Sequence, residues 1–178
     1  MKFYFIKLFI AVLPFFYAAD NTAWKIKSSA ITFRIKNAGL TVDGSFSGIE
    51  ADIKFNPLKP EDAVIKASVS SKSINTGNDM RDGHLRKPEY FDAEKFPKIT
   101  LQSVKIEKTG PITYNGFFNL TMKGITKPVL IPFTFMKIPE KTEIKGTFTL
   151  NRRDYGVGGN SISMADNATV TIVIDLTE

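Results

Sequence analysis

The sequence predicts an all-β protein whose strands bury their apolar faces against one another, as in a sandwich or a closed barrel. Residues 20–178 hold 41 Ile, Val and Thr but only 17 Leu and Ala, and β-branched side chains favour strands over helices. Apolar and polar residues also alternate over most of the chain, which is the period of a half-buried strand. Breaker clusters such as Asn56-Pro57 and Thr109-Gly110-Pro111 separate the runs, so we expect antiparallel neighbours.

Taken in order, the alternating runs predict eight to ten strands. They lie at 24–27, 31–36, 42–47, 51–55, 65–69, 99–101, 114–122, 129–135, 144–150 and 168–176. Two stretches lack the alternation: 77–86 is expected to hold a short helix, and 156–165 a long glycine-rich loop. A membrane barrel is the alternative, but its strands need about 9–11 residues and aromatic girdles. Most runs here are shorter and carry their aromatic residues in the middle of the strand.

The first nineteen residues have the layout of a secretory signal peptide. Two basic residues, Lys2 and Lys7, precede an apolar run at 8–17 and the small residues Ala18 and Ala19. The run is too short for a spanning helix and contains Pro14, although an uncleaved membrane anchor is the alternative. We therefore predict a signal peptide at 1–19, a single domain at 20–178, and a periplasmic or secreted protein.

Composition excludes several kinds of chemistry. The 178 residues include no Cys and one His, which excludes disulfide scaffolds, thiolate or multi-His zinc sites and Cys nucleophiles. We predict no metal, cofactor or catalytic residue. The formal charge of +6 falls to +4 without the leader, and no basic run is interleaved with aromatic residues. Nucleic acid is therefore not an expected partner.

The densest polar cluster of the chain is Arg81, Asp82, His84 and Arg86. Its cations could pair with a phosphate or hydrogen-bond the polar head of a ligand. The alternative is a brace, in which these side chains fix a loop to the body of the domain. A small hydrolase using His84, oriented by Asp79 or Asp82, is a further alternative, but no strained Gly-x-Ser-x-Gly turn supplies a nucleophile.

Several segments, in a consistent order over about 22–176, resemble the YceI-like family of exported lipid-binding proteins. The matching segments include Thr76-Gly77-Asn78, His84-Leu85-Arg86, Tyr90-Phe91-Asp92, Phe96-Pro97, Leu120-Thr121-Met122, Gly124-Ile125-Thr126-Lys127-Pro128-Val129 and Asn151-Arg152-x-Asp154-Tyr155-Gly156-Val157. One departure is visible, because the family often has a His after the first long strand, where this chain reads Lys36-Asn37.

The resemblance implies an eight-stranded, antiparallel, lipocalin-like barrel with a helix or loop insertion near 77–92. It also implies a homodimer and a long apolar pocket for a polyisoprenoid or another long-chain lipid. We therefore expect an exported, soluble lipid carrier that performs no chemistry and contacts membranes transiently to take up its lipid. The competing hypothesis is a protein-interaction module with a solid, dry core.

The predicted ligand-binding residues are the inward-facing apolar set and four polar residues. They are Phe33, Ile35, Phe46, Phe55, Leu101, Phe118, Phe133, Phe135, Phe148 and Ile172, together with Arg81, Asp82, His84 and Arg152. The same apolar residues would form the core of a protein without a ligand, so the volume of the interior cavity distinguishes the two hypotheses. Trp24 is expected to plug one end of the barrel, and one of Arg152 and Arg153 to pair with Asp154 before a lid or turn at 156–165.

Overall fold

The computed structural model describes residues 23–178, so the signal peptide predicted at 1–19 lies outside the described residues. Nine strands confirm the all-β prediction. They are β1 (Ala23–Asn37), β2 (Leu40–Phe46), β3 (Glu50–Lys54), β4 (Val64–Ser70), β5 (Lys98–Lys108), β6 (Thr113–Met122), β7 (Ile125–Ile138), β8 (Lys141–Asn151) and β9 (Asn167–Thr177). The short helix α1 (Asp79–Leu85) lies within the predicted insertion, and η1 (Pro60–Asp62), η2 (Ser71–Ser73) and η3 (Arg152–Tyr155) are single 3₁₀ turns.

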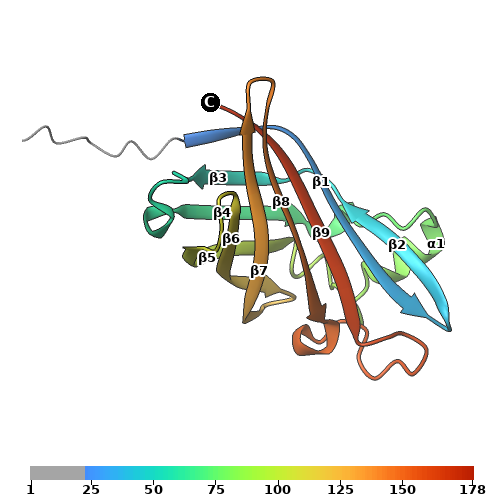
Figure 1. Cartoon of the computed structure of the whole chain (residues 1–178). Helices are drawn as coiled ribbons and strands as arrows, with labels where there is room; N and C mark the ends of the chain where they lie inside the picture. The colour runs from blue at the N-terminus through green and yellow to red at the C-terminus, as the bar shows by residue number, and fades with distance from the viewer. Residues whose placement is uncertain (1–22) are drawn as a thin grey trace, which may run out of the picture.

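Eight of the strands close into an antiparallel barrel (Figure 1). The order around the ring is β1, β3, β4, β5, β6, β7, β8 and β9, and β9 pairs back with β1. Closure leaves no open edge in this ring, so the strands bury their apolar faces toward a common interior. Within residues 23–178, no helix has the length and apolar character needed to cross a membrane.

The extra strand β2 does not belong to the ring. It pairs with the same edge of β1 as β3 does, but farther along the strand. The start of β1 pairs with β3, through Trp24 opposite Ile53, and its second half pairs with β2, through Ile31 opposite Phe46. The predicted runs at 24–27 and 31–36 therefore belong to one strand of 15 residues. A register shift against β9 between Ile26 and Ser28 breaks the alternation between them.

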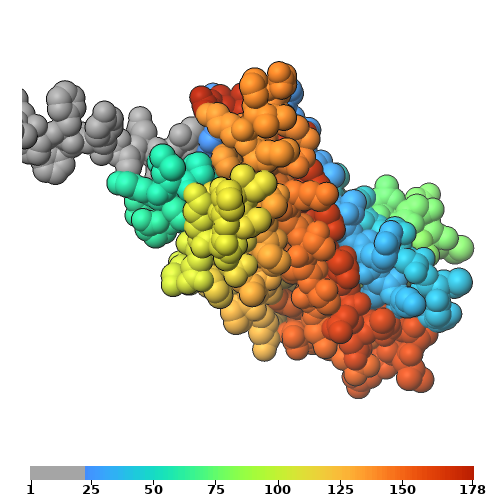
Figure 2. Space-filling view, viewed as in Figure 1, coloured from blue at the N-terminus to red at the C-terminus, as the bar shows by residue number. Residues whose placement is uncertain are grey.

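The β1–β2 hairpin lies at one end of the barrel and meets the loop 156–166. Its two turn residues, Ala38 and Gly39, have φ values of 50° and 80°, as a type I′ turn requires. The backbone N–H of Ala38 donates a 2.7 Å hydrogen bond to the carbonyl of Ser163. Figure 2 shows the side chains of the hairpin and of this loop meeting at the same end of the molecule.

Aromatic side chains fill the opposite end of the barrel. The ring of Phe55 lies 5.1 Å from Tyr114, 6.0 Å from Phe133 and 4.9 Å from Phe135, measured between centroids. Trp24 packs on Phe135 at 5.5 Å, and its indole N–H donates a 2.9 Å hydrogen bond to the carbonyl of Phe55. Trp24 therefore helps to plug this end, as the sequence predicted.

Candidate functional site

The barrel interior contains three cavities in a row. The cavity nearest α1 and the loop 156–166, which we call the upper cavity, has a volume of about 410 Å³. The middle cavity has a volume of about 100 Å³, and the lower cavity, nearest the aromatic plug, about 60 Å³. Phe46, Met122, Leu150 and Val170 line both the upper and the middle cavity. Ile49, Ala67, Leu101 and Ile172 line both the middle and the lower cavity. The three cavities therefore adjoin one another along the barrel, a row that we call the tunnel, and the interior is not the solid core of the interaction-module hypothesis.

Strand β9 shows how far the tunnel extends. Its inward-facing residues line the three cavities in turn, from Ala168 and Val170 in the upper cavity through Ile172 to Ile174 in the lower one. At about 3.3 Å per residue, this stretch spans roughly 20 Å. The aromatic cluster closes the tunnel beyond the lower cavity. The upper cavity reaches the surface, because Met80 lines it and is 80% exposed.

Most of the predicted apolar ligand-binding residues line the tunnel. The upper cavity is lined by Phe33, Ile35 and Phe46. The middle cavity is lined by Phe46, Leu101, Phe148 and Ile172. The lower cavity is lined by Leu101, Phe118, Phe133 and Ile172. Phe55 and Phe135 line none of these cavities, because their rings pack within the aromatic cluster. The structure therefore places those two residues in the plug of the barrel.

The Arg81–Arg86 cluster forms a brace as well as one wall of the upper cavity. The carboxylate of the buried Asp82 accepts hydrogen bonds from the backbone N–H and the hydroxyl of Thr76. Arg81 donates to the hydroxyl and the carbonyl of Thr76, each at 2.7 Å. Asp82 does not line the cavity, whereas Arg81 and His84 do.

Outside the cavity, Arg86 extends the brace by donating to the carbonyls of Lys72 and Ile74. These bonds join the end of α1 to the chain that follows β4. The hydrolase hypothesis required Asp79 or Asp82 to orient His84. The carboxylate of Asp82 is engaged by Thr76 instead, and among the described residues no hydrogen bond or ion pair joins Asp79 to His84. No group of three or more His, Cys, Asp or Glu residues within 23–178 is arranged to hold a metal ion.

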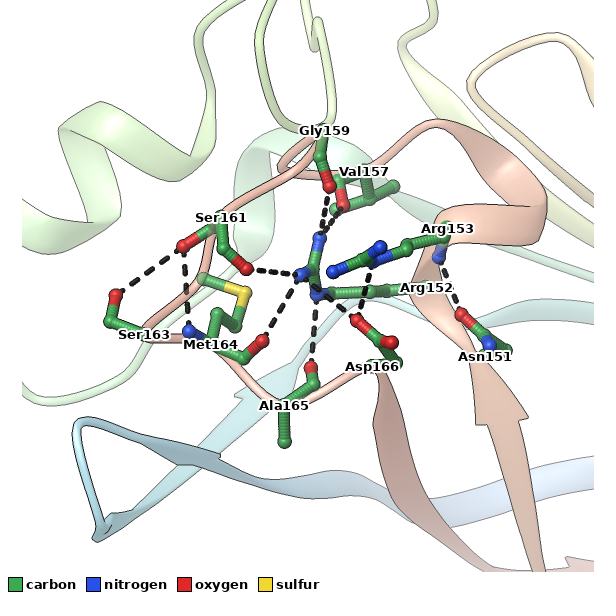
Figure 3. Close-up of polar contacts among 10 residues, drawn as sticks. All are labelled: Asn151, Arg152, Arg153, Val157, Gly159, Ser161, Ser163, Met164, Ala165 and Asp166. Carbon is green, nitrogen blue, oxygen red and sulfur yellow. Dashed lines mark hydrogen bonds and ion pairs between the residues drawn. The ribbon is translucent and has the colours of Figure 1, made fainter.

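Arg152 holds the loop 156–166 together and also lines the upper cavity (Figure 3). It is 3% exposed. Its guanidinium donates to the carbonyls of Val157, Gly159, Ser161, Met164 and Ala165 and to the carboxylate of Asp166. Arg153 also pairs with Asp166. The predicted pairing with Asp154 is therefore wrong, since the loop returns the chain so that Asp166 lies beside both arginines.

Two buried tyrosines flank the tunnel. Burial raises the pKa of Tyr155 to about 12, and the negative charge of Asp154 contributes to the increase. At the plugged end, burial also raises the pKa of Tyr114. Both phenols therefore stay neutral at physiological pH and add no charge to the interior.

Several lining residues were absent from the predicted set. Val42, Ala168 and Val170 lie on the same alternating faces as predicted residues, so the period-2 pattern contained the signal for them. Met80, Tyr90 and Met164 come from α1 and loops, where no periodic pattern marks them. Asn37, the last residue of β1, brings an amide to the upper cavity. It follows Phe33 and Ile35 on the same alternating face of β1, so the period-2 pattern contained the signal for this position too.

Comparison with known proteins agrees with this fold. The model of the YceI-like domain matches residues 22–177. A Pseudomonas fluorescens protein called UPF0312 protein is 31% identical over 138 residues, which is 71% of this chain and 70% of that one. The crystal structure of Burkholderia cenocepacia BcnA superposes with a TM-score of 0.79 at 23% identity, covering 84% of this chain and 96% of that chain.

A second structural neighbour is a polyisoprenoid binding domain from Saccharophagus degradans. Its TM-score is 0.69 at 12% identity, covering 86% of this chain and 96% of that chain. At such identities the two solved structures show the fold alone. The family model, by contrast, covers nearly all of the described residues, and this chain therefore belongs to the YceI-like domain family.

Proposed function

We propose that this protein binds one long-chain, isoprenoid-like lipid in its tunnel and carries it without chemical change. The observation that carries the proposal is a row of adjoining apolar cavities that reaches the surface at α1 and is plugged by aromatic rings at the other end. Ligand sites in proteins are typically concave, mostly apolar and equipped with a few polar groups that fix orientation. The upper cavity has that character.

The dimensions of the tunnel support a single lipid chain. The tunnel follows roughly 20 Å of β9. Because barrel strands tilt by about 40° from the barrel axis, it is about 15 Å deep, close to the thickness of one leaflet of the bilayer core. Each methylene removed from water contributes about 0.8 kcal/mol, although the cost of ordering the chain reduces the net affinity. The Saccharophagus degradans neighbour, a polyisoprenoid binding domain, supports the same ligand class.

The proposal includes export and transient contact with a membrane. The leader-like pattern at 1–19 supports a periplasmic or secreted location. Leu40 and Ile162, on the two segments that meet at the mouth end, are 73% and 102% exposed, and Met80 lies on the rim of the upper cavity. Such apolar side chains favour contact with a lipid surface over water. A lipid could then enter the tunnel without crossing bulk solvent.

The homodimer stays a prediction. Its most suitable surface is the outer face of β5, β6 and β7, where Phe117 lies directly opposite Leu130 and both side chains are exposed. Val104, which is 66% exposed, occupies the neighbouring bulge of β5. This face lies outside the barrel, so a dimer formed through it would leave the tunnel free.

Organic extraction of the protein purified from its native host, followed by mass spectrometry, tests the proposed function. We expect one class of long-chain lipid, at about one molecule per chain. The control is an equal amount of another exported protein from the same host, which reports lipid that adheres nonspecifically. If no lipid co-purifies and the delipidated protein binds no prenol in vitro, the proposal is wrong.

A further inference from the structure

Two glycines on inward faces of strands lie beneath aromatic rings of the tunnel wall. The first is Gly44 of β2, which lies between Val42 and Phe46 on the face that lines the upper cavity and directly opposite Phe33 of β1. A Cβ atom at Gly44 would lie 2.7 Å from Cε1 of Phe33 and closer still to Cζ, well inside the ordinary contact distance of about 3.5–4.0 Å. The ring of Phe33 therefore occupies the space in which any other residue at position 44 would place its side chain.

The same arrangement recurs at the lower cavity. Gly116 of β6 precedes Phe118 on the same face of the strand, and Phe118 lines the lower cavity. A Cβ atom at Gly116 would lie 2.9 Å from Cζ of Phe118 and closer still to Cε2. Neither Gly44 nor Gly116 has a positive φ, so backbone geometry does not require glycine at either position. Glycine also destabilises the interior of a strand, where it often marks a close approach of other atoms. Here the atoms that approach are the two rings.

A ring that lies over a glycine takes up space at the wall of the tunnel instead of in its lumen. Phe33 lines the upper cavity, the widest part of the tunnel beneath α1. A methyl group at position 44 would point inward from β2, so the ring would have to move by about 1 Å or more to reach contact distance. The movement would carry the ring away from β2, toward the cavity that it lines. One methyl group in the wall would therefore narrow the upper cavity by displacing a whole ring.

Resting on the proposed function, we propose that Gly44 determines the width of lipid chain that the upper cavity admits, because it lets the Phe33 ring lie against β2. Gly116 has the same role for Phe118 at the lower cavity. Isoprenoid chains carry regular methyl branches and are wider than straight chains. The chemical class that needs this space is thus a methyl-branched chain. In an apolar pocket, a single methylene group changes discrimination between ligands by about 10–200-fold.

Two saturated alcohols that differ only in branching test this role. Phytanol and hexadecan-1-ol have the same head and main chains of equal length, but phytanol carries four methyl branches. Each is titrated against the delipidated protein by displacement of a fluorescent fatty acid. The wild type should bind phytanol more tightly, because the branches bury additional apolar area. Gly44→Ala should bind phytanol at least about tenfold more weakly than the wild type does, and hexadecan-1-ol within about threefold of the wild type.

Two further variants separate displacement of the ring from general damage to the fold. Gly83→Ala on α1 is the matched control, because a Cβ atom there meets nothing within 4 Å, and it should leave both affinities unchanged. The double variant Gly44→Ala/Phe33→Leu removes the displaced ring and should recover most of the lost affinity for phytanol. A merely structural role of Gly44 would give no such recovery.

Gly116→Ala repeats the test at the lower cavity and decides the matter if Gly44→Ala does not fold. It should likewise weaken binding of phytanol more than binding of hexadecan-1-ol. The proposal is overturned if the glycine variants weaken both alcohols equally or neither of them, or if the wild type prefers hexadecan-1-ol. Each of these results would leave the lipid-binding function intact. Failure of the wild type to bind either alcohol would instead count against the proposed function itself.

Discussion

Burial of the Tyr155 phenol lowers the stability of the folded protein. It is 1% exposed, and its hydroxyl has no hydrogen-bond partner within residues 23–178. A buried polar group without a partner destabilises the folded state by about 1–3 kcal/mol. Burial, with the neighbouring charge of Asp154, also raises the pKa of the phenol to about 12, so the folded protein holds this proton more tightly than the unfolded chain does.

Tyr155→Phe should therefore stabilise the protein at pH 7 by about 1 kcal/mol. It should also weaken the alkaline loss of stability. The unfolded phenol ionises near its ordinary pKa of 10.0, and the folded one near about 12. The loss of stability that ionisation of Tyr155 causes is therefore absent below pH 10 and develops between pH 10 and pH 12, where the unfolded phenol ionises and the folded one does not.

Thermal unfolding from pH 7 to pH 12 measures both effects. Lysines titrate in the wild type and the variant alike, so the difference between the two curves reports Tyr155. Parallel curves through the alkaline range would contradict the raised pKa. A lower melting temperature of the variant at pH 7 would contradict the description of the hydroxyl as unpaired.

At the scale of elements, the loop 156–166 is ordered by one side chain rather than by regular secondary structure. Arg152 supplies donors to five of its carbonyls and to Asp166. Buried carbonyls need such partners, and a charged donor forms stronger bonds than a neutral one. The loop forms part of the upper cavity, so Arg152 shapes the tunnel mouth although its donors are not free for a ligand.

Arg152→Met should lower the free energy of unfolding by about 3–5 kcal/mol, the usual cost of removing one partner from a buried charged network. Arg153→Met removes the same charge from the next residue, which is about half exposed at its side chain and whose pairing with Asp166 is worth less than about 1 kcal/mol. Urea denaturation of both variants, with limited proteolysis at 156–166, measures the difference. Equal destabilisation by the two substitutions would refute the role given to Arg152.

The strands could be predicted from sequence because each has an apolar face that the period-2 pattern reveals. The prediction failed where a local irregularity hides the pattern, as at the register shift near Ile26, which divides β1 into two apparent runs. The partner of Arg152 could not be predicted either. Asp154 is nearest in sequence, but the path of the loop brings Asp166 to the guanidinium. Loop paths depend on distant contacts such as Ala38 with Ser163, which no local pattern encodes.

At the scale of the whole molecule, function depends on space that side chains leave empty. Inward-facing residues such as Phe148 and Phe133 were expected from the sequence, but alternation alone cannot tell a filled core from a tunnel. The difference arises from closure of β1 on β9 and from the distribution of bulk along the interior. Aromatic rings pack against one another at one end, whereas in the remainder small residues such as Ala67, Ala168 and Val170 lie among the aromatic ones.

If the lipid lies inside the barrel, a bulky side chain in the tunnel should block lipid binding. Val170 lines both the upper and the middle cavity, and Thr169, its neighbour on β9, is exposed on the outside. Val170→Phe and Thr169→Phe therefore add the same residue type inside and outside the tunnel. Circular dichroism establishes that both variants fold, and titration with geranylgeraniol gives the affinity. We predict one bound molecule per chain for the wild type and Thr169→Phe, and affinity at least about tenfold weaker for Val170→Phe; equal affinity in all three proteins would contradict a lipid site inside the barrel.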